Sequence, residues 1–174
     1  MGACSVAIPN YIPLGCYEFD SGRIVACAFI SDAKDFTDIT DPTEWQDEIY
    51  ESDIVIFQSV RGSYPPAGPQ EQPSYGAQST RTVGLNHVVN LRIPAIKGNE
   101  EFWDAVNLSD DRKFAFVIGE SYETLFYVNQ VVQVLGVLNI EEGLDTNADW
   151  QVTVKWTNMS LPTTSDVPTG IFQP

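Results

Sequence analysis

The sequence predicts a mainly β fold, an antiparallel β-sandwich or partly open barrel with one or two short flanking helices, a long interstrand loop and extended termini. Three observations predict it: several segments alternate between apolar and polar residues, short turns separate them, and only two stretches have the pattern of a helix. The 174 residues, 43% of them hydrophobic, suffice for one domain with a sizeable core. We therefore expect a β domain over residues 18–159, an N-terminal arm over 1–17 and a C-terminal arm over 160–174.

The expected strands differ in how they are buried. Arg23–Ser31 is apolar on both faces, which is typical of a central strand covered on both sides. Leu85–Ile96 has one apolar face and one more polar face, which includes Arg92, so we expect it to be half exposed. Asp149–Met159 alternates as an antiparallel strand buried on one face requires. Four further segments complete the set: Asp53–Val60, Lys113–Glu120, Tyr122–Val128 and Gln130–Ile140.

Two helices are expected between the strands. Asp41 is a capping residue followed by proline, and Glu44 is placed to return the cap, so a helix begins here and ends near residue 51. Trp45 and Ile49 should turn inward. A second helix begins at Asn99 and should cover an open end or one face of the sheet with an apolar stripe: Phe102, Trp103 and Val106.

The stretch Ser63–Gly84 is too polar and too long to join the core of a small domain. It has almost no aliphatic residues and contains four prolines and two tyrosines. Loops of this length inside compact domains usually have a function. Prolines lower the entropy lost when a segment is ordered on a partner, and tyrosines are rigid amphipathic anchors. We therefore expect the loop to reach a neighbouring subunit, while a merely flexible loop would have the same composition.

The chain is strongly acidic, with a net charge of −15 from 24 acidic and nine basic residues. Such a surface repels phosphate, so sequence-specific DNA binding and docking to an anionic membrane are both disfavoured. The densest run, Ser31–Asp53, holds nine acids and one cation, Lys34, without the glycine and spacing of a calcium loop. It is either a solvated acidic surface or the lining of a channel past which DNA slides. The residues that we assign to this acidic face are Asp32, Asp35, Asp38, Asp47 and Glu48.

The sequence offers little chemistry for catalysis. His87 is the sole histidine, it lies on the apolar face of an expected strand, and no nucleophile motif accompanies it, so we expect it to be buried or at an interface and satisfied by the backbone. Neither phosphate-binding glycine pattern occurs. Cys4, Cys16 and Cys27 lack the close pair of a zinc site and are expected to be reduced thiols, at least one of them buried. We expect no enzyme activity, no cofactor, no metal and no membrane span, and synthesis in a reducing cytoplasm.

The order of features resembles that of tail-tube and connector-ring proteins of tailed bacteriophages. The resemblance lies in "SGRI" at residues 21–24 after Cys16, a strand pair, a long loop ending in "RTVG" at 81–84, "FWDAVNLSDDRKFAFVI" from Phe102, and a late strand with Trp150 and Trp156 before an extended tail. It implies a β-sandwich with a flanking helix, whose inner sheets join into a ring around a DNA channel. It also implies that the long loop contacts the adjacent ring or subunit.

These observations together favour a non-enzymatic structural protein of a virion. It would form a homo-oligomeric ring or tube in the tail or neck, with other virion proteins as neighbours, and DNA would pass without specific binding. One alternative is a capsid-surface or head-fibre attachment protein. Another is a carbohydrate-binding module with Tyr122, Tyr127, Trp150 and Trp156 in a sugar cleft. The residues that we expect at subunit interfaces are Tyr64, Pro66, Tyr75, Arg81, Ile171 and Phe172.

Overall fold

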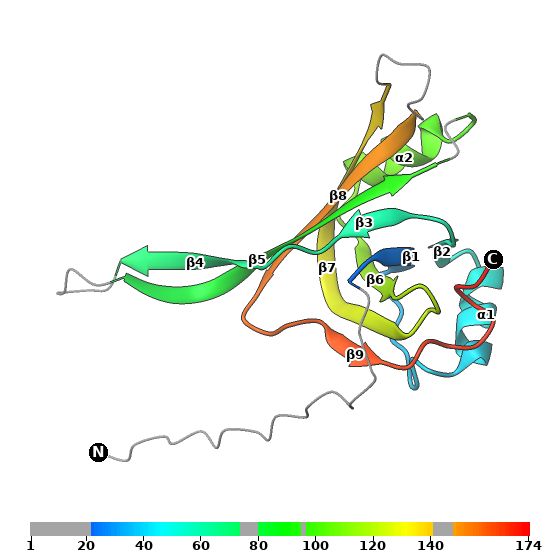
Figure 1. Ribbon diagram of the computed structural model, residues 1–174, viewed down its shortest axis with the longest axis horizontal. Helices are drawn as coiled ribbons and strands as arrows, with labels where there is room; N and C mark the ends of the chain where they lie inside the picture. Colours follow the sequence, from blue (N-terminus) through cyan, green and yellow to red (C-terminus); the bar gives the residue numbers. More distant parts are fainter. Residues whose placement is uncertain (1–21, 74–79, 95–96, 141–147) are drawn as a thin grey trace.

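A computed structural model describes residues 22–73, 80–94, 97–140 and 148–174 (Figure 1). Over these residues the fold is mainly β, with nine antiparallel strands in one hydrogen-bonded sheet and two short helices. The expected fold class is confirmed. The expected N-terminal arm, Tyr75, Cys4 and Cys16 lie outside the described residues.

Along the chain, one strand is followed by a helix, four strands, a second helix and four more strands. The helices are α1 (Pro42–Tyr50) and α2 (Glu100–Leu108). The strands are β1 (Ile24–Ser31), β2 (Ile54–Phe57), β3 (Arg61–Ser63), β4 (Gly68–Pro73), β5 (Thr80–Ile93), β6 (Arg112–Ile118), β7 (Thr124–Asn139), β8 (Asp149–Asn158) and β9 (Thr163–Ser165).

The body of the molecule is a partly open barrel. The sheet runs β2-β1-β3-β5-β8-β7-β6, and β6 also pairs with the other edge of β1. A single residue pair, Ile24 with Gly62, joins β1 to β3. Gly62 also permits the close approach of β3 to β5, since a Cβ there would lie 2.5 Å from a side-chain carbon of Leu91 and 2.8 Å from the carbonyl oxygen of Asn90. Between β1 and β3, the wall of the barrel therefore consists of one residue pair.

Strands β1 and β6 are buried on both faces, as the doubly apolar pattern of the first strand predicts. On one face Phe29, Phe114 and Phe116 form a core with the inward side chains of β5 and β8, such as Val154. On the other face the alanines of β1 and β6 form a second core with Trp45 of α1. The molecule thus has three layers: the β5–β8 sheet, the β1–β6 sheet, and α1 with the C-terminal tail.

Helix α1 begins where the sequence predicts, but only half of the expected cap forms. The Asp41 carboxylate accepts a hydrogen bond from the backbone N–H of Thr43 at 2.8 Å. Glu44 turns away and instead accepts from the backbone N–H of Thr37 at 2.9 Å. The glutamate therefore fastens the preceding acidic loop to the helix, whereas Ile49 remains 39% exposed rather than turned inward.

Helix α2 covers one end of the first core through Trp103, which is 2% exposed. The indole lies over Gly136 of β7, where a Cβ would come within 2.3 Å of the ring. The side-chain amide of Asn107 donates to the carbonyl oxygen of Gly136 at 2.8 Å and accepts from its N–H at 2.7 Å. These two bonds satisfy the edge of β7 beyond the end of its pairing with β6, and a glycine at residue 136 leaves room for the ring of Trp103.

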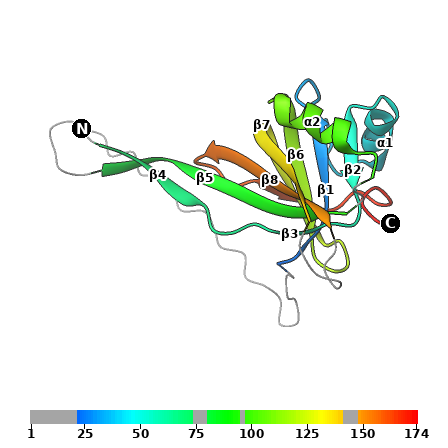
Figure 2. The ribbon, with the colours of Figure 1, turned by 90° about the horizontal axis from the view of Figure 1, so that it is seen from above.

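Two expected boundaries are corrected. Tyr122–Val128 and Gln130–Ile140 lie almost wholly in one continuous strand, β7, because Asn129 between them falls at an irregularity in the pairing with β6 rather than in a turn. The first half of β7 pairs with β6 and the second half with β8. The expected long loop, residues 63–84, contains β4 and the start of β5, which pair with each other and project from the body (Figures 1 and 2). A polar composition is compatible with strands whose side chains all face water.

Candidate interaction surfaces

The projecting arm, defined as β4 with residues 80–84 of β5, has no core of its own. Every residue of β4 is exposed, as are Thr80, Arg81 and Thr82 of the facing strand. Within the described residues β4 pairs only with β5, and β5 pairs with β8 only from Leu85 onward. Among the residues that the structure places, both outer edges of the arm are therefore unpaired. A two-stranded ribbon of this kind is only marginally stable in water.

The interface residues expected in this region separate into two groups. Pro66 and Arg81 are exposed, so their side chains are accessible to a partner. Tyr64 is corrected: its ring packs against the chain's own core, with centroids 5.7 Å from Phe116 and 5.9 Å from Trp156. The tyrosine directly follows β3, before the chain leaves the body. Its ring therefore lies next to buried aromatic side chains and packs on them instead of facing solvent. Burial also raises the pKa of Tyr64.

His87 is fully buried, as expected, and its ring nitrogens have one backbone partner and one side-chain partner. Its Nε2 donates to the carbonyl oxygen of Asn158 at 3.1 Å, which leaves Nδ1 to accept from the hydroxyl of Tyr64 at 2.6 Å. The imidazole stacks on Trp156 with a centroid distance of 5.0 Å. Both nitrogens are occupied by structural partners, so the imidazole, in the middle of β5, connects the end of β8 with the residue that follows β3.

The C-terminal tail is corrected from an outward arm to a part of the fold. Ile171 is 5% exposed and Phe172 is fully buried, with the phenyl ring 5.1 Å from the indole of Trp45. The Gln58 side chain donates to the carbonyl oxygens of Ile171 and Gln173, at 3.2 and 2.9 Å. The small alanine side chains of β1 and β6 leave space in the second core. Large side chains from the tail fill this space because protein interiors are close-packed. This apolar pair is therefore not available to a neighbouring subunit in this conformation.

The acidic surface is organised around one lysine. The ammonium of Lys34 lies 2.8 Å from Glu48, 3.3 Å from Glu51 and 3.4 Å from Asp53. A hydrogen bond to Glu48 is the largest cause of the raised pKa of Lys34. These three carboxylates are close enough to hold a cation, and the ammonium of Lys34 already takes that place. The arrangement is that of a solvated salt-bridge cluster.

The five acidic residues assigned from the sequence do not share one role. Glu48 is bound to Lys34, and Asp35 accepts at 2.7 Å from Lys113, an ammonium buried beneath it. Asp38 accepts from the hydroxyl and the N–H of Thr40, which lowers the pKa of the carboxylate. Asp32 and Asp47 are exposed, as are Asp35 and Asp38, so four of the five carboxylates face solvent.

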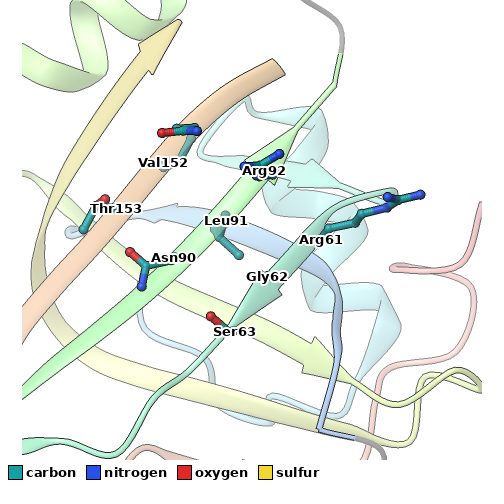
Figure 3. A pocket seen from close by; sticks show the side chains of 9 residues that line it. Arg61, Gly62, Ser63, Asn90, Leu91, Arg92, Val152 and Thr153 are labelled. Atoms are coloured by element: carbon teal, nitrogen blue, oxygen red, sulfur yellow. The ribbon is translucent and has the colours of Figure 1, made fainter. Parts of the chain in front are cut away.

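The outer face of the β3–β5–β8 sheet holds a shallow hollow that the sequence did not single out. Its volume is about 410 Å³, and three neighbouring strands line it (Figure 3). Arg61 of β3 lies directly opposite Arg92 of β5, with Ser63, Asn90 and Thr153 beside them. Arg92 also lies 3.7 Å from the carboxylate of Asp149. Cations facing one another across a strand pair repel, so the face is suited to receiving an anionic group.

The aromatic residues proposed for a sugar cleft lie mostly inside the protein. Trp150 and Trp156 are each 6% exposed and Tyr127 is 9% exposed. The free thiol among the described residues, Cys27, is likewise buried, and burial raises its pKa. Neither the rings nor the thiol are presented to a ligand.

Comparisons with protein-family models, with curated proteins and with solved structures found no match to this chain. Among the helices that the structure describes, neither is long and apolar enough to cross a membrane.

Proposed function

We propose that this chain is a non-enzymatic structural protein that assembles with copies of itself through its projecting arm. The setting that the sequence resemblance suggests is a ring or tube in the tail or neck of a tailed bacteriophage particle, around a channel for DNA. One observation carries the proposal: the arm extends a hydrogen-bonded pair of strands into solvent without burying a single residue of β4.

An arm of this kind is costly to maintain alone. Ordering each backbone residue costs about 1–2 kcal/mol, and the arm recovers little of this because it buries almost no apolar surface. A partner that pairs with a free edge supplies the missing hydrogen bonds and covers the exposed side chains. Contact with another copy therefore accounts for the presence of the arm.

The two edges of the arm are not equivalent. Pro69 and Pro73 remove amide donors from β4, a feature that limits indiscriminate pairing of an edge strand. Residues 80–84 of β5 contain no proline and keep their full set of backbone donors and acceptors. We assign the pairing edge to this part of β5, and the neighbouring copy supplies the surface that it joins.

The test removes the arm and leaves the body intact. Pro69 pairs with Leu85, so residues 70–84 can be replaced by Asn-Gly, which closes a two-residue hairpin at this pair. The full chain is expected to form multi-copy particles by mass photometry and electron microscopy, whereas the shortened chain remains monomeric with an unchanged melting temperature. A full chain that is monomeric at every concentration, or a shortened chain that assembles equally well, would contradict the proposal.

A further inference from the structure

We infer that a second contact joins the copies: the outer face of the β3–β5–β8–β7 sheet docks the exposed surface of α1 from the next copy. This inference rests on the proposed self-assembly and adds the two surfaces that meet. It follows from the strand register, the distribution of charge and the position of each surface in the layers of the fold.

The register aligns the outward side chains of four strands in rows. One row contains Arg61, Arg92, Gln151 and Val137, and the next contains Ser63, Asn90, Thr153 and Leu135. Residues between them in sequence, such as Leu91 and Val152, are buried in the first core. Because partners directly opposite in a sheet share a face, these rows form a continuous outer surface.

This surface differs from the rest of the chain in charge. Its outward positions include Arg61, Arg92 and Lys155, with Asp149 as the opposing carboxylate, in a chain whose net charge is −15. It also includes an apolar strip on β7, where Leu135 is 54% exposed and Val137 is 48% exposed. Basic groups beside exposed aliphatic side chains favour an acidic partner that carries apolar or aromatic groups of its own.

The exposed surface of α1 has that complementary chemistry. Tyr50 is 91% exposed, and Gln46 and Asp47 lie one turn before it on the same side of the helix. Glu51 follows, and Ile49 and Val55 expose 39% and 38% of their surface nearby in the chain. Exposed tyrosine is among the residues that most often anchor interfaces.

The two surfaces cannot meet within one chain. The inner side of the β5–β8 sheet packs on one face of β1 and β6, while Trp45 of α1 packs on the opposite face. The outer sheet face and the exposed side of α1 therefore point away from each other across the three layers (Figure 2). A contact between them joins different copies head to tail, and head-to-tail contacts produce closed rings or open filaments.

Reciprocal charge reversal tests the contact. The variant R61E/R92E makes the sheet face acidic, and the variant Q46K/D47K makes the α1 surface basic. Each variant alone opposes like charges and is expected to remain monomeric by mass photometry, whereas the wild type assembles. An equimolar mixture of the two variants restores opposite charges at every head-to-tail junction, so the mixture is expected to assemble with alternating composition. Assembly of the wild type is also expected to weaken at high salt.

Matched reversals at other exposed positions, Lys97→Glu and Glu120→Lys, are expected to leave assembly unchanged. Charge variants that assemble alone, or a mixture that stays monomeric while the wild type assembles, would overturn the inference. Retention of duplex DNA by the wild type, lost in R61E/R92E without any change in assembly, would assign the basic face to nucleic acid instead. These outcomes differ from failure of the proposed function, in which the wild type itself does not assemble.

Discussion

The position of the C-terminal tail leads to a direct prediction about stability. Replacing Phe172 by alanine removes a fully buried ring that lies 5.1 Å from Trp45. A buried aromatic side chain covers about 150–250 Å², which at about 25 cal/mol per Å² corresponds to about 4–6 kcal/mol. Measured Phe→Ala substitutions in cores cost about 3–5 kcal/mol, which is a large part of the stability of an ordinary domain.

Urea denaturation followed by tryptophan fluorescence measures this loss. With a slope of about 2 kcal/mol per molar urea, the midpoint is expected to fall by about 1.5–2.5 M. Leu161→Ala is the matched control, because Leu161 is 68% exposed and its truncation should cost less than about 0.5 kcal/mol. A loss below about 1 kcal/mol for Phe172→Ala, or one that depends on protein concentration, would refute burial of the tail in its own chain.

Three further predictions follow from other parts of the core. Gly136→Ala should destabilise by about 1–3 kcal/mol in thermal or urea unfolding because the new methyl meets Trp103, whereas Gly68→Ala, with open space around it, should cost less. Burial, with nearby carboxylates, raises the pKa of Tyr127 from 10.0 to about 12. The unfolded chain therefore loses this proton first, the free energy of unfolding should fall between about pH 10 and 12, and Tyr127→Phe should flatten that fall. Tyr64→Phe should lower stability by about 1 kcal/mol in urea by removing the hydroxyl partner of the buried histidine.

Local patterns in the sequence were sufficient for most of the framework. The doubly apolar segment that became β1, the alternation that became β8 and the apolar stripe of α2 each depend on residues close in the chain. The burial of His87 followed from its position on an apolar strand face. In each case the period of the side chains matched the element that formed.

The remainder depends on contacts between distant residues. Glu44 could cap its own helix, but its carboxylate instead accepts hydrogen bonds from two backbone amides of the neighbouring loop. Phe172 looks like part of a polar tail until Trp45 is placed beside it, 127 residues earlier by the numbering. Arg61 and Arg92 share a face only because β3 pairs with β5, and the sequence does not reveal that register.

The most direct test of arm-mediated assembly is a cross-linking measurement between copies. A photoreactive residue at Thr82, an exposed position in the middle of the β5 part of the arm, is introduced into a mixture of heavy-isotope and light chains. Mass spectrometry is expected to find mixed heavy–light cross-links from the arm to the body of another copy, and none from the same label at Glu120. Cross-links from Thr82 that are confined to single chains, or no cross-links in an assembled particle, would contradict the account.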